Sequence, residues 1–208
     1  MTEHTGQVRG ALTRERLVRS AAAEFALHGY DGTSLSRVCK AAGATMGALT
    51  FHYPSKASLA QAVCTAGIRA TQARVDEADR KGQGPLQSVG KITGALAELL
   101  SADAVARAAA RLSREQPPLA MDWRGSWLPL VRTRLHQAEV LDLLRPGARP
   151  ESAALMVGSL VAAVEAGLLP QLGGALLPSP TVEEHFAELW QTALQGIGAS
   201  QDSPVSAS

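Results

Sequence analysis

The sequence of 208 residues predicts an all-α protein with an N-terminal three-helix domain and a larger C-terminal helical domain. Apolar residues recur at the three- and four-residue spacing of amphipathic helices along most of the chain. Clusters of Gly and Pro separate these stretches, and no stretch shows the apolar and polar alternation of a half-buried strand. We therefore divide the chain into a flexible N-terminal arm (1–10), the three-helix domain (11–58), a helical body (59–198) and a disordered tail (199–208).

The first predicted helix begins at Thr13 and carries an apolar stripe that includes Leu17, Ala21 and Phe25. This stripe gives the helix one face that packs against the rest of the domain. The helix is expected to end at Gly29, because glycine is the usual C-cap residue.

Two short helices follow, joined by a turn at Gly43. Ser34 is placed to cap the first of them, and Thr45 is placed to cap the second, which runs to about Tyr53. Leu49 has the spacing that buries it between two closely crossing helices. This pattern is typical of a helix-turn-helix, whose second helix lies in the major groove of DNA.

Glycine and proline breaks divide the body into long helices. A fourth helix begins at Pro54 and Ser55, extends to about Arg80 and is expected to connect the three-helix domain to the body. Further helices are predicted over residues 86–100, 102–115, 123–144, 151–169 and 182–197.

The net charge of +1 conceals a difference between the two ends of the chain. Residues 1–60 contain seven Lys and Arg against four Asp and Glu, so the N-terminal end is basic and the remainder is slightly acidic. Such an asymmetry is typical of a DNA-reading module attached to a domain that does not bind nucleic acid.

Other classes of protein fit the sequence less well. It has no apolar run long enough for a transmembrane helix and no secretory signal, so we expect a cytoplasmic protein with no membrane partner. Cys39 and Cys64 are expected to be reduced thiols, and the histidines form no metal-ligand cluster with them, so we expect no metal and no cofactor. The motifs of a P-loop, a dinucleotide site and a nucleophile elbow are missing, which argues against an enzyme.

The segment from about Thr13 to Ala62 contains a characteristic set of residues, namely Phe25, Gly29, Tyr30, Thr33, Val38, Ala42, Gly43, Gly47, Leu49 and the run Phe51-His52-Tyr53-Pro54-Ser55-Lys56. With these residues the segment resembles the DNA-binding domain of the TetR family of dimeric bacterial transcriptional regulators. Within that family it is most similar to the receptors for γ-butyrolactone autoregulators of antibiotic-producing actinobacteria. The chain departs from the family at Thr50, where the family usually has a tyrosine that contacts the DNA backbone.

The exposed side of the second short helix holds the candidates for base contact. Thr45, Met46 and Thr50 are placed to reach base edges or phosphates, since Thr can bond several bases and apolar groups pack on the thymine methyl. Gly47 has no side chain, so the backbone can approach DNA closely at this position.

The resemblance implies further contacts with DNA phosphates. They come from His52 and Lys56 and from the amides at Thr33 and Ser34, while Arg37 adds positive charge nearby. The alternative for His52 is an ordinary surface residue at a helix end.

Two aromatic residues in the same run have structural alternatives. Phe51 is expected in the core rather than on DNA. Tyr53 is equally suited to packing and to a phosphate contact, and we keep it among the candidates for DNA binding.

The body is expected to bind a ligand and to dimerise. Trp127, on the same predicted helix as Trp123, is a candidate wall of an apolar pocket, and the resembling receptors have a tryptophan in the corresponding helix. The alternative is that Trp127 is ordinary core. The other candidate walls are aliphatic and favour a small lipophilic ligand; they are Leu130, Val131, Val157, Leu160, Val161 and Val164.

The sequence therefore predicts a ligand-responsive repressor that binds a palindromic operator in double-stranded DNA as a homodimer. The expected ligand is a small lipophilic signal, γ-butyrolactone-like or antibiotic-like, that releases the repressor from the operator. The alternative is a DNA-binding regulator whose C-terminal domain only dimerises or binds a protein partner. An activator is also compatible with the sequence.

Overall fold

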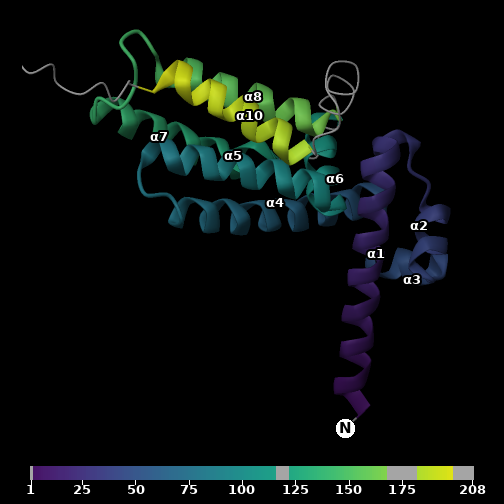
Figure 1. Ribbon diagram of the computed structural model, residues 1–208. Helices are drawn as coiled ribbons and strands as arrows, with labels where there is room; N and C mark the ends of the chain where they lie inside the picture. The colour runs from purple at the N-terminus through teal and green to yellow at the C-terminus, as the bar shows by residue number, and fades with distance from the viewer. Residues whose placement is uncertain (1, 116–121, 168–181, 199–208) are drawn as a thin grey trace, which may run out of the picture. The chain divides into compact units, whose positions relative to one another are not determined.

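The computed structural model describes residues 2–115, 122–167 and 182–198, and it confirms the all-α fold class. Within those ranges, the one contact of β type is an isolated bridge between Leu144 and Gly198. Figure 1 shows the helices, which in chain order are α1 (Thr2–Gly32), α2 (Leu35–Ala42), α3 (Met46–His52), α4 (Lys56–Arg80), α5 (Pro85–Ala102), α6 (Ala104–Glu115), the 3₁₀ helix η2 (Arg124–Ser126), α7 (Leu128–Val140), α8 (Pro150–Glu165) and α10 (Val182–Ile197).

The helices belong to two compact units. The first contains Met1–Ala73 and Leu99–Ser126, and the second contains Arg74–Glu98 and Trp127–Ser208. This division differs from the predicted boundary between residues 58 and 59, because α6 and most of α4 fall in the same unit as α1, α2 and α3. The tail predicted over the last ten residues lies outside the part of the chain that the structure describes.

α1 begins at Thr2 rather than at the predicted Thr13, so residues 2–10, predicted as a flexible arm, have helical backbone. Adding residues to an existing helix costs far less than nucleating one, and no proline interrupts this stretch. Gly29 breaks the regular geometry with a φ of 70° and a ψ of −175°. The predicted end of the first helix at Gly29 is therefore the place where the helix kinks.

α2 ends at Gly43, which has a φ of 59°. The Gly43 amide donates to the Lys40 carbonyl at 3.3 Å, and the Ala44 amide donates to the Cys39 carbonyl at 2.9 Å. These two bonds satisfy carbonyl groups at the end of α2 that have no partner within the helix. Glycine adopts this left-handed conformation without a Cβ clash, so the predicted turn glycine is confirmed.

The two predicted helix caps behave differently. Thr45 precedes α3, and its hydroxyl accepts a hydrogen bond from the Ala48 amide at 3.1 Å, as expected of an N-cap. Ser34 precedes α2 with extended backbone, but its side chain makes no capping hydrogen bond. The first amides of α2 therefore receive no side-chain acceptor from their cap residue.

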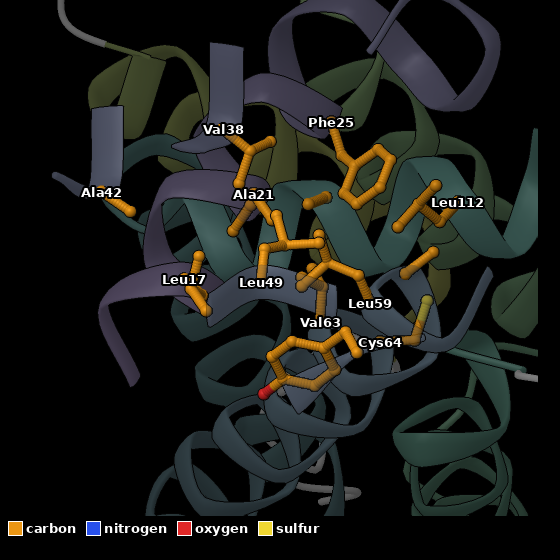
Figure 2. Packing of buried hydrophobic residues seen from close by; sticks show 14 of the residues in the cluster. Leu17, Ala21, Phe25, Val38, Ala42, Leu49, Leu59, Val63, Cys64 and Leu112 are labelled. Carbon is orange, nitrogen blue, oxygen red and sulfur yellow. The ribbon is translucent and has the colours of Figure 1, made fainter. Parts of the chain in front are cut away.

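A cluster of buried apolar side chains holds the first unit together. Leu49 of α3 is fully buried, and Figure 2 shows it in the middle of the cluster with Ala21 and Leu59 on either side. Burial of one leucine or phenylalanine side chain contributes about 1.5–3 kcal/mol. The cluster joins α1, α2, α3, α4 and α6, and its members are Leu17, Ala21, Ala22, Phe25, Val38, Cys39, Ala42, Leu49, Tyr53, Leu59, Ala60, Val63, Cys64, Ala108 and Leu112.

α7 begins at Leu128 and not at Trp123, so the predicted helix over 123–144 is wrong at its start. Pro129 explains the difference, because proline suits the first turn of a helix, where its missing N–H is tolerated, and not the interior. Trp127 is the cap residue of α7, whereas Trp123 precedes η2 in the first unit. The two tryptophans therefore do not share a helix. The predicted ends at 144 and 169 are also too late, because α7 ends at Val140 and α8 at Glu165. The other predicted helices of the body agree within two residues with α4, α5, α6 and α10.

An ion pair in the second unit joins the end of α4 to α7. Arg134 Nε donates to Asp79 Oδ1 at 2.7 Å, and a second guanidinium N–H donates to Asp79 Oδ2 at 2.5 Å. The hydrogen bonds from Arg134 hold the pKa of the Asp79 carboxyl below its usual value. Because two parallel bonds fix the orientation of both groups, the pair sets the contact between these helices.

Candidate nucleic-acid interface

α3 exposes several residues around its single buried residue. Thr45, Met46, Gly47 and Thr50 are exposed, while Leu49 anchors the helix in the core. A Cβ added at Gly47 meets no atom closer than the Thr45 hydroxyl oxygen, at 3.9 Å. The fold of the free protein therefore does not require glycine at position 47.

The hydroxyl of Thr50 is already hydrogen-bonded within α3. It lies 3.0 Å from the Met46 carbonyl oxygen and 3.2 Å from the Gly47 carbonyl oxygen, to which it donates. The hydroxyl proton of Thr50 is thus donated to a carbonyl oxygen of α3. The methyl group and the oxygen lone pairs remain available for contact with a partner.

Phe51 is 84% exposed, so the expectation that it lies in the core is wrong. The reason is its position on the helix: each residue advances about 100°, so Phe51 points about 200° away from the buried Leu49. Its ring contacts the His52 ring edge-on, with centroids 5.3 Å apart. An exposed aromatic ring therefore adds an apolar surface to α3.

Of the two roles predicted for Tyr53, packing and a phosphate contact, the structure shows packing. It is 7% exposed and belongs to the buried cluster of the first unit. Burial raises the pKa of its hydroxyl, and the positive charge of Arg14 partly opposes that shift. His52 is half-buried, and its Nδ1 is buried without a hydrogen bond to any residue that the structure describes.

Thr33 uses both of its donors inside the protein. It is 4% exposed; its hydroxyl donates to the Gly29 carbonyl at 2.7 Å, and its amide donates to the Tyr30 carbonyl at 3.3 Å. These bonds close the turn between α1 and α2. Ser34, by contrast, is half-buried at the start of α2 with a hydroxyl that caps no amide.

The predicted cationic contacts, Arg37 and Lys56, also have partners within the first unit. Arg37 Nε donates to the Glu24 carboxylate at 2.8 Å, and the same side chain reaches the Gly32 carbonyl. The Lys56 ammonium lies 4.7 Å from the centre of the Tyr30 ring. Both side chains are held in place near α3.

Arg14 is a cationic residue on α1 that the sequence reasoning did not single out. It is exposed and makes no hydrogen bond or ion pair with another described residue. It lies three positions before Leu17 and seven before Ala21, so it continues the face of α1 that packs in the core. Its charge acts on Tyr53, which follows α3. This helical spacing is the sequence signal that identifies it.

The predicted ligand walls lie on α7, on its cap and on α8, two helices that pack together. Trp127, Val131, Val157 and Val161 are buried, each no more than 1% exposed. The remaining three are half-buried; they are Leu130, Leu160 and Val164.

A groove of about 680 Å³ lies elsewhere in the second unit. It is formed by the start of α5 and the second half of α7, and none of the predicted ligand walls lines it. Its lining residues are Pro85, Thr133, His136, Gln137, Val140 and Leu141.

Across residues 2–115, 122–167 and 182–198, no three His, Cys, Asp or Glu side chains come together in a way that could hold a metal ion. In the same described ranges, every helix is too short or too polar to cross a membrane.

Comparison with known proteins places this helix-turn-helix in a family. Residues 17–63 match the family described as bacterial regulatory proteins, tetR family. The chain is 30% identical over 145 residues to the A-factor receptor protein of Streptomyces griseus, a match that covers 67% of this chain and 50% of that protein. The chain thus spans about half the length of this curated relative.

Two solved structures extend the similarity over most of the chain. One, described as the molecular basis for control of antibiotic production by bacterial hormones, is 30% identical, has a TM-score of 0.68 and covers 90% of this chain and 98% of that one. The other, a γ-butyrolactone receptor described as ArpA-like, is 26% identical, has a TM-score of 0.67 and covers 89% and 98%. The chain belongs to the tetR family of bacterial regulatory proteins. It is a helix-turn-helix regulator related to the γ-butyrolactone receptors.

Proposed function

We propose that the chain is a cytoplasmic repressor that binds a palindromic operator in double-stranded DNA as a homodimer and is released by a small lipophilic signal. The observation that carries the DNA-binding part is the exposed face of α3. Leu49 fixes this helix in the core, while Met46, Gly47 and Thr50 are left exposed, and Gly47 lies about 200° around the helix from Leu49. A dimer would present two such helices to successive major grooves, about 34 Å apart.

Gly47 supports this proposal because the fold of the free protein does not require glycine at this position. Replacing an exposed helical glycine by alanine stabilises a helix by roughly 0.5–1 kcal/mol. With glycine at position 47, α3 is therefore less stable than it would be with alanine. A backbone that must come close to DNA explains the choice, since a Cβ would then meet the DNA. Phe51 and Met46 supply apolar contacts of the kind that pack on thymine methyl groups.

The second unit supports dimerisation. Leu155 on α8 is 73% exposed, and Leu189 on α10 is 43% exposed. Large apolar side chains exposed on two helices of one unit are typical of surfaces that pack against a partner. A second copy of the chain would bury them, as in the four-helix bundle that the family resemblance implies.

The ligand proposal rests on the aliphatic character of the contact between α7 and α8. Val131, Val157 and Val161 are buried there, next to the cap residue Trp127. Such a lining favours a lipophilic molecule with few polar groups. The relatives named above include an A-factor receptor and a γ-butyrolactone receptor, so the ligand class we propose is γ-butyrolactone-like or antibiotic-like.

The experiment is a fluorescence-anisotropy titration of purified protein against DNA fragments from upstream of its own gene and its neighbours. Sequence-specific binding that weakens as salt rises is expected, because phosphate contacts release counterions. Gly47→Ala should reduce specific binding by at least about fivefold, since a wrong contact at a base edge costs about 1–3 kcal/mol. Its melting temperature should not fall.

Gly94→Ala is the matched control, because a Cβ at Gly94 of α5 meets no atom within 4 Å and is therefore accommodated in the fold, as one at Gly47 is. It should leave DNA binding unchanged. Equal binding by both variants would contradict the proposed role of α3. Melting-temperature shifts with lactone and antibiotic libraries then test the ligand, and binding to DNA without any ligand response would favour a body that only dimerises or binds a protein.

A further inference from the structure

Two charged side chains at the end of α6 form hydrogen bonds with the backbone at the end of α1. An Arg111 guanidinium N–H donates to the Ala26 carbonyl of α1 at 3.0 Å. The Glu115 carboxylate accepts a hydrogen bond from the Tyr30 amide at 2.9 Å. Arg111 and Glu115 also pair with each other at 2.5 Å, so the two side chains act as one unit on the α1 terminus.

Gly29 allows this contact because the Glu115 and Arg111 side chains occupy the space that a Cβ would fill. A Cβ at Gly29 would lie 2.5 Å from one Glu115 carboxylate oxygen and 2.8 Å from an Arg111 nitrogen, closer than real Cβ contacts come. The backbone there also has a φ of 70°, a conformation that glycine adopts without strain. Both the shape and the backbone at this point therefore fit the two charged side chains.

Tyr30 connects Glu115 to Lys56. Its amide donates to the Glu115 carboxylate, and its ring contacts the Lys56 ammonium. The Tyr30 ring stacks parallel to the Phe25 ring, with centroids 6.1 Å apart. The Lys56 ammonium lies 4.7 Å from the Tyr30 ring centre and 3.3 Å from the Asp31 carbonyl oxygen, to which it donates. A cation over an aromatic face is attracted by the ring, so the place of Tyr30 sets the place of this ammonium.

We propose that Arg111 and Glu115 are positioning residues for Lys56: they fix the end of α1, which fixes Tyr30, which places the Lys56 ammonium for contact with a DNA phosphate. This inference rests on the proposed function, because it assumes that Lys56 binds DNA. It extends the DNA-binding machinery to the last turn of α6, which lies outside the helix-turn-helix.

The test is a double-mutant cycle on operator binding with Glu115→Ala, Lys56→Met and the double variant. Glu115→Ala should lower affinity by about three- to tenfold and flatten the dependence of log K on log salt toward that of Lys56→Met. The double variant should bind no more weakly than Lys56→Met alone, because Glu115 acts through Lys56. Glu115→Gln keeps an oxygen for the Tyr30 amide and should restore part of the affinity.

Glu77→Ala is the matched control, since Glu77 pairs with Lys81 at the same i, i+4 spacing and belongs to the second unit. It should leave affinity and salt dependence unchanged. Additive effects in the cycle, or an unchanged salt slope in both Glu115 variants, would overturn the inference. If wild-type protein showed no specific binding to any fragment, the proposed function would fail instead. Should Glu115→Ala not fold, the same cycle with Arg111→Ala decides the matter, because Arg111 holds the same end of α1.

Discussion

α3 of the first unit and α8 of the second use their residues in opposite ways. α3 has 7 residues and buries Leu49 alone, so nearly all of the helix faces outward. α8 has 16 residues and buries side chains along its length, namely Pro150, Ala153, Ala154, Val157 and Val161. The short helix is attached by one anchor, whereas the long helix is attached by many small and aliphatic side chains.

This difference teaches where single residues matter. On α3 each exposed position has its own neighbours and its own chemistry, so one substitution can change binding without changing the fold. On α8 the buried residues all pack in the core of the second unit. Aliphatic side chains of similar volume can replace one another there at a low cost in stability. The DNA-binding part of the proposal can therefore be tested residue by residue, while the ligand part needs a ligand.

The largest expected effect comes from removing the anchor of α3. Leu49→Ala should destabilise the protein by about 2–5 kcal/mol, because it leaves a cavity in the core of the first unit. Urea unfolding monitored by circular dichroism measures this destabilisation. Leu27→Ala, at a side chain that is 71% exposed on α1, should stay within about 0.5 kcal/mol of wild type. Similar destabilisation of the two variants would mean that α3 is not held by Leu49.

The helix-turn-helix could be predicted from the sequence because its signals are local. Gly43 closes a turn that requires a left-handed backbone, Thr45 caps the helix that follows it, and Leu49 has the spacing of a buried residue. Each signal acts within a few residues along the chain, so no knowledge of distant contacts was needed. The same holds for Gly29, where the first helix was expected to end.

The errors arose where distant contacts or a single strong local preference decided the outcome. Phe51 is predicted in the core, but the helical phase set by Leu49 turns it outward. Glu115 could not be linked to Tyr30, because 85 positions separate them and only the packing of α6 on α1 joins them. The apolar spacing predicts one helix for Trp123 and Trp127, but the preference of Pro129 for a first turn places the start of α7 after both.

The Asp79–Arg134 pair sharpens the comparison, because it is a specific polar contact in the unit otherwise described by aliphatic packing. Asp79→Asn should cost about 1.5–3 kcal/mol at pH 7, the range for hydrogen bonds to charged groups. The native pKa of Asp79 is lowered, chiefly by the hydrogen bonds from Arg134, so its stabilisation is complete above the unfolded pKa of about 3.9. This stabilisation disappears as the pH falls through the lowered native value.

Unfolding by urea at a series of pH values from neutral to acid measures this effect. The difference between wild type and Asp79→Asn should be constant near neutral pH and should shrink in acid. Glu98→Gln, which changes an exposed partner of Arg74, should differ little from wild type at any pH. A difference for Asp79→Asn that is the same at all pH values would show that the charge of Asp79 contributes nothing.

The smallest expected effect concerns the edge of the DNA-binding face, where α1 passes the end of α3. Arg14 continues the buried face of α1 and its charge reaches Tyr53, so we expect its guanidinium to bind a DNA phosphate. Arg14→Ala should weaken operator binding by about three- to tenfold at low salt and reduce the salt slope by about 0.9 for each phosphate that the variant no longer binds. Fluorescence anisotropy over a range of salt concentrations measures both quantities.

Arg16→Ala removes the same charge from the same helix and is the matched control. Arg16 is also exposed, but two residues along a helix it points about 200° away from Arg14. If long-range attraction alone were at work, the two variants would be weakened equally, and the weakening would vanish at high salt. Weaker binding by Arg14→Ala alone, together with a smaller salt slope, requires a direct contact and extends the DNA-binding surface from α3 onto α1.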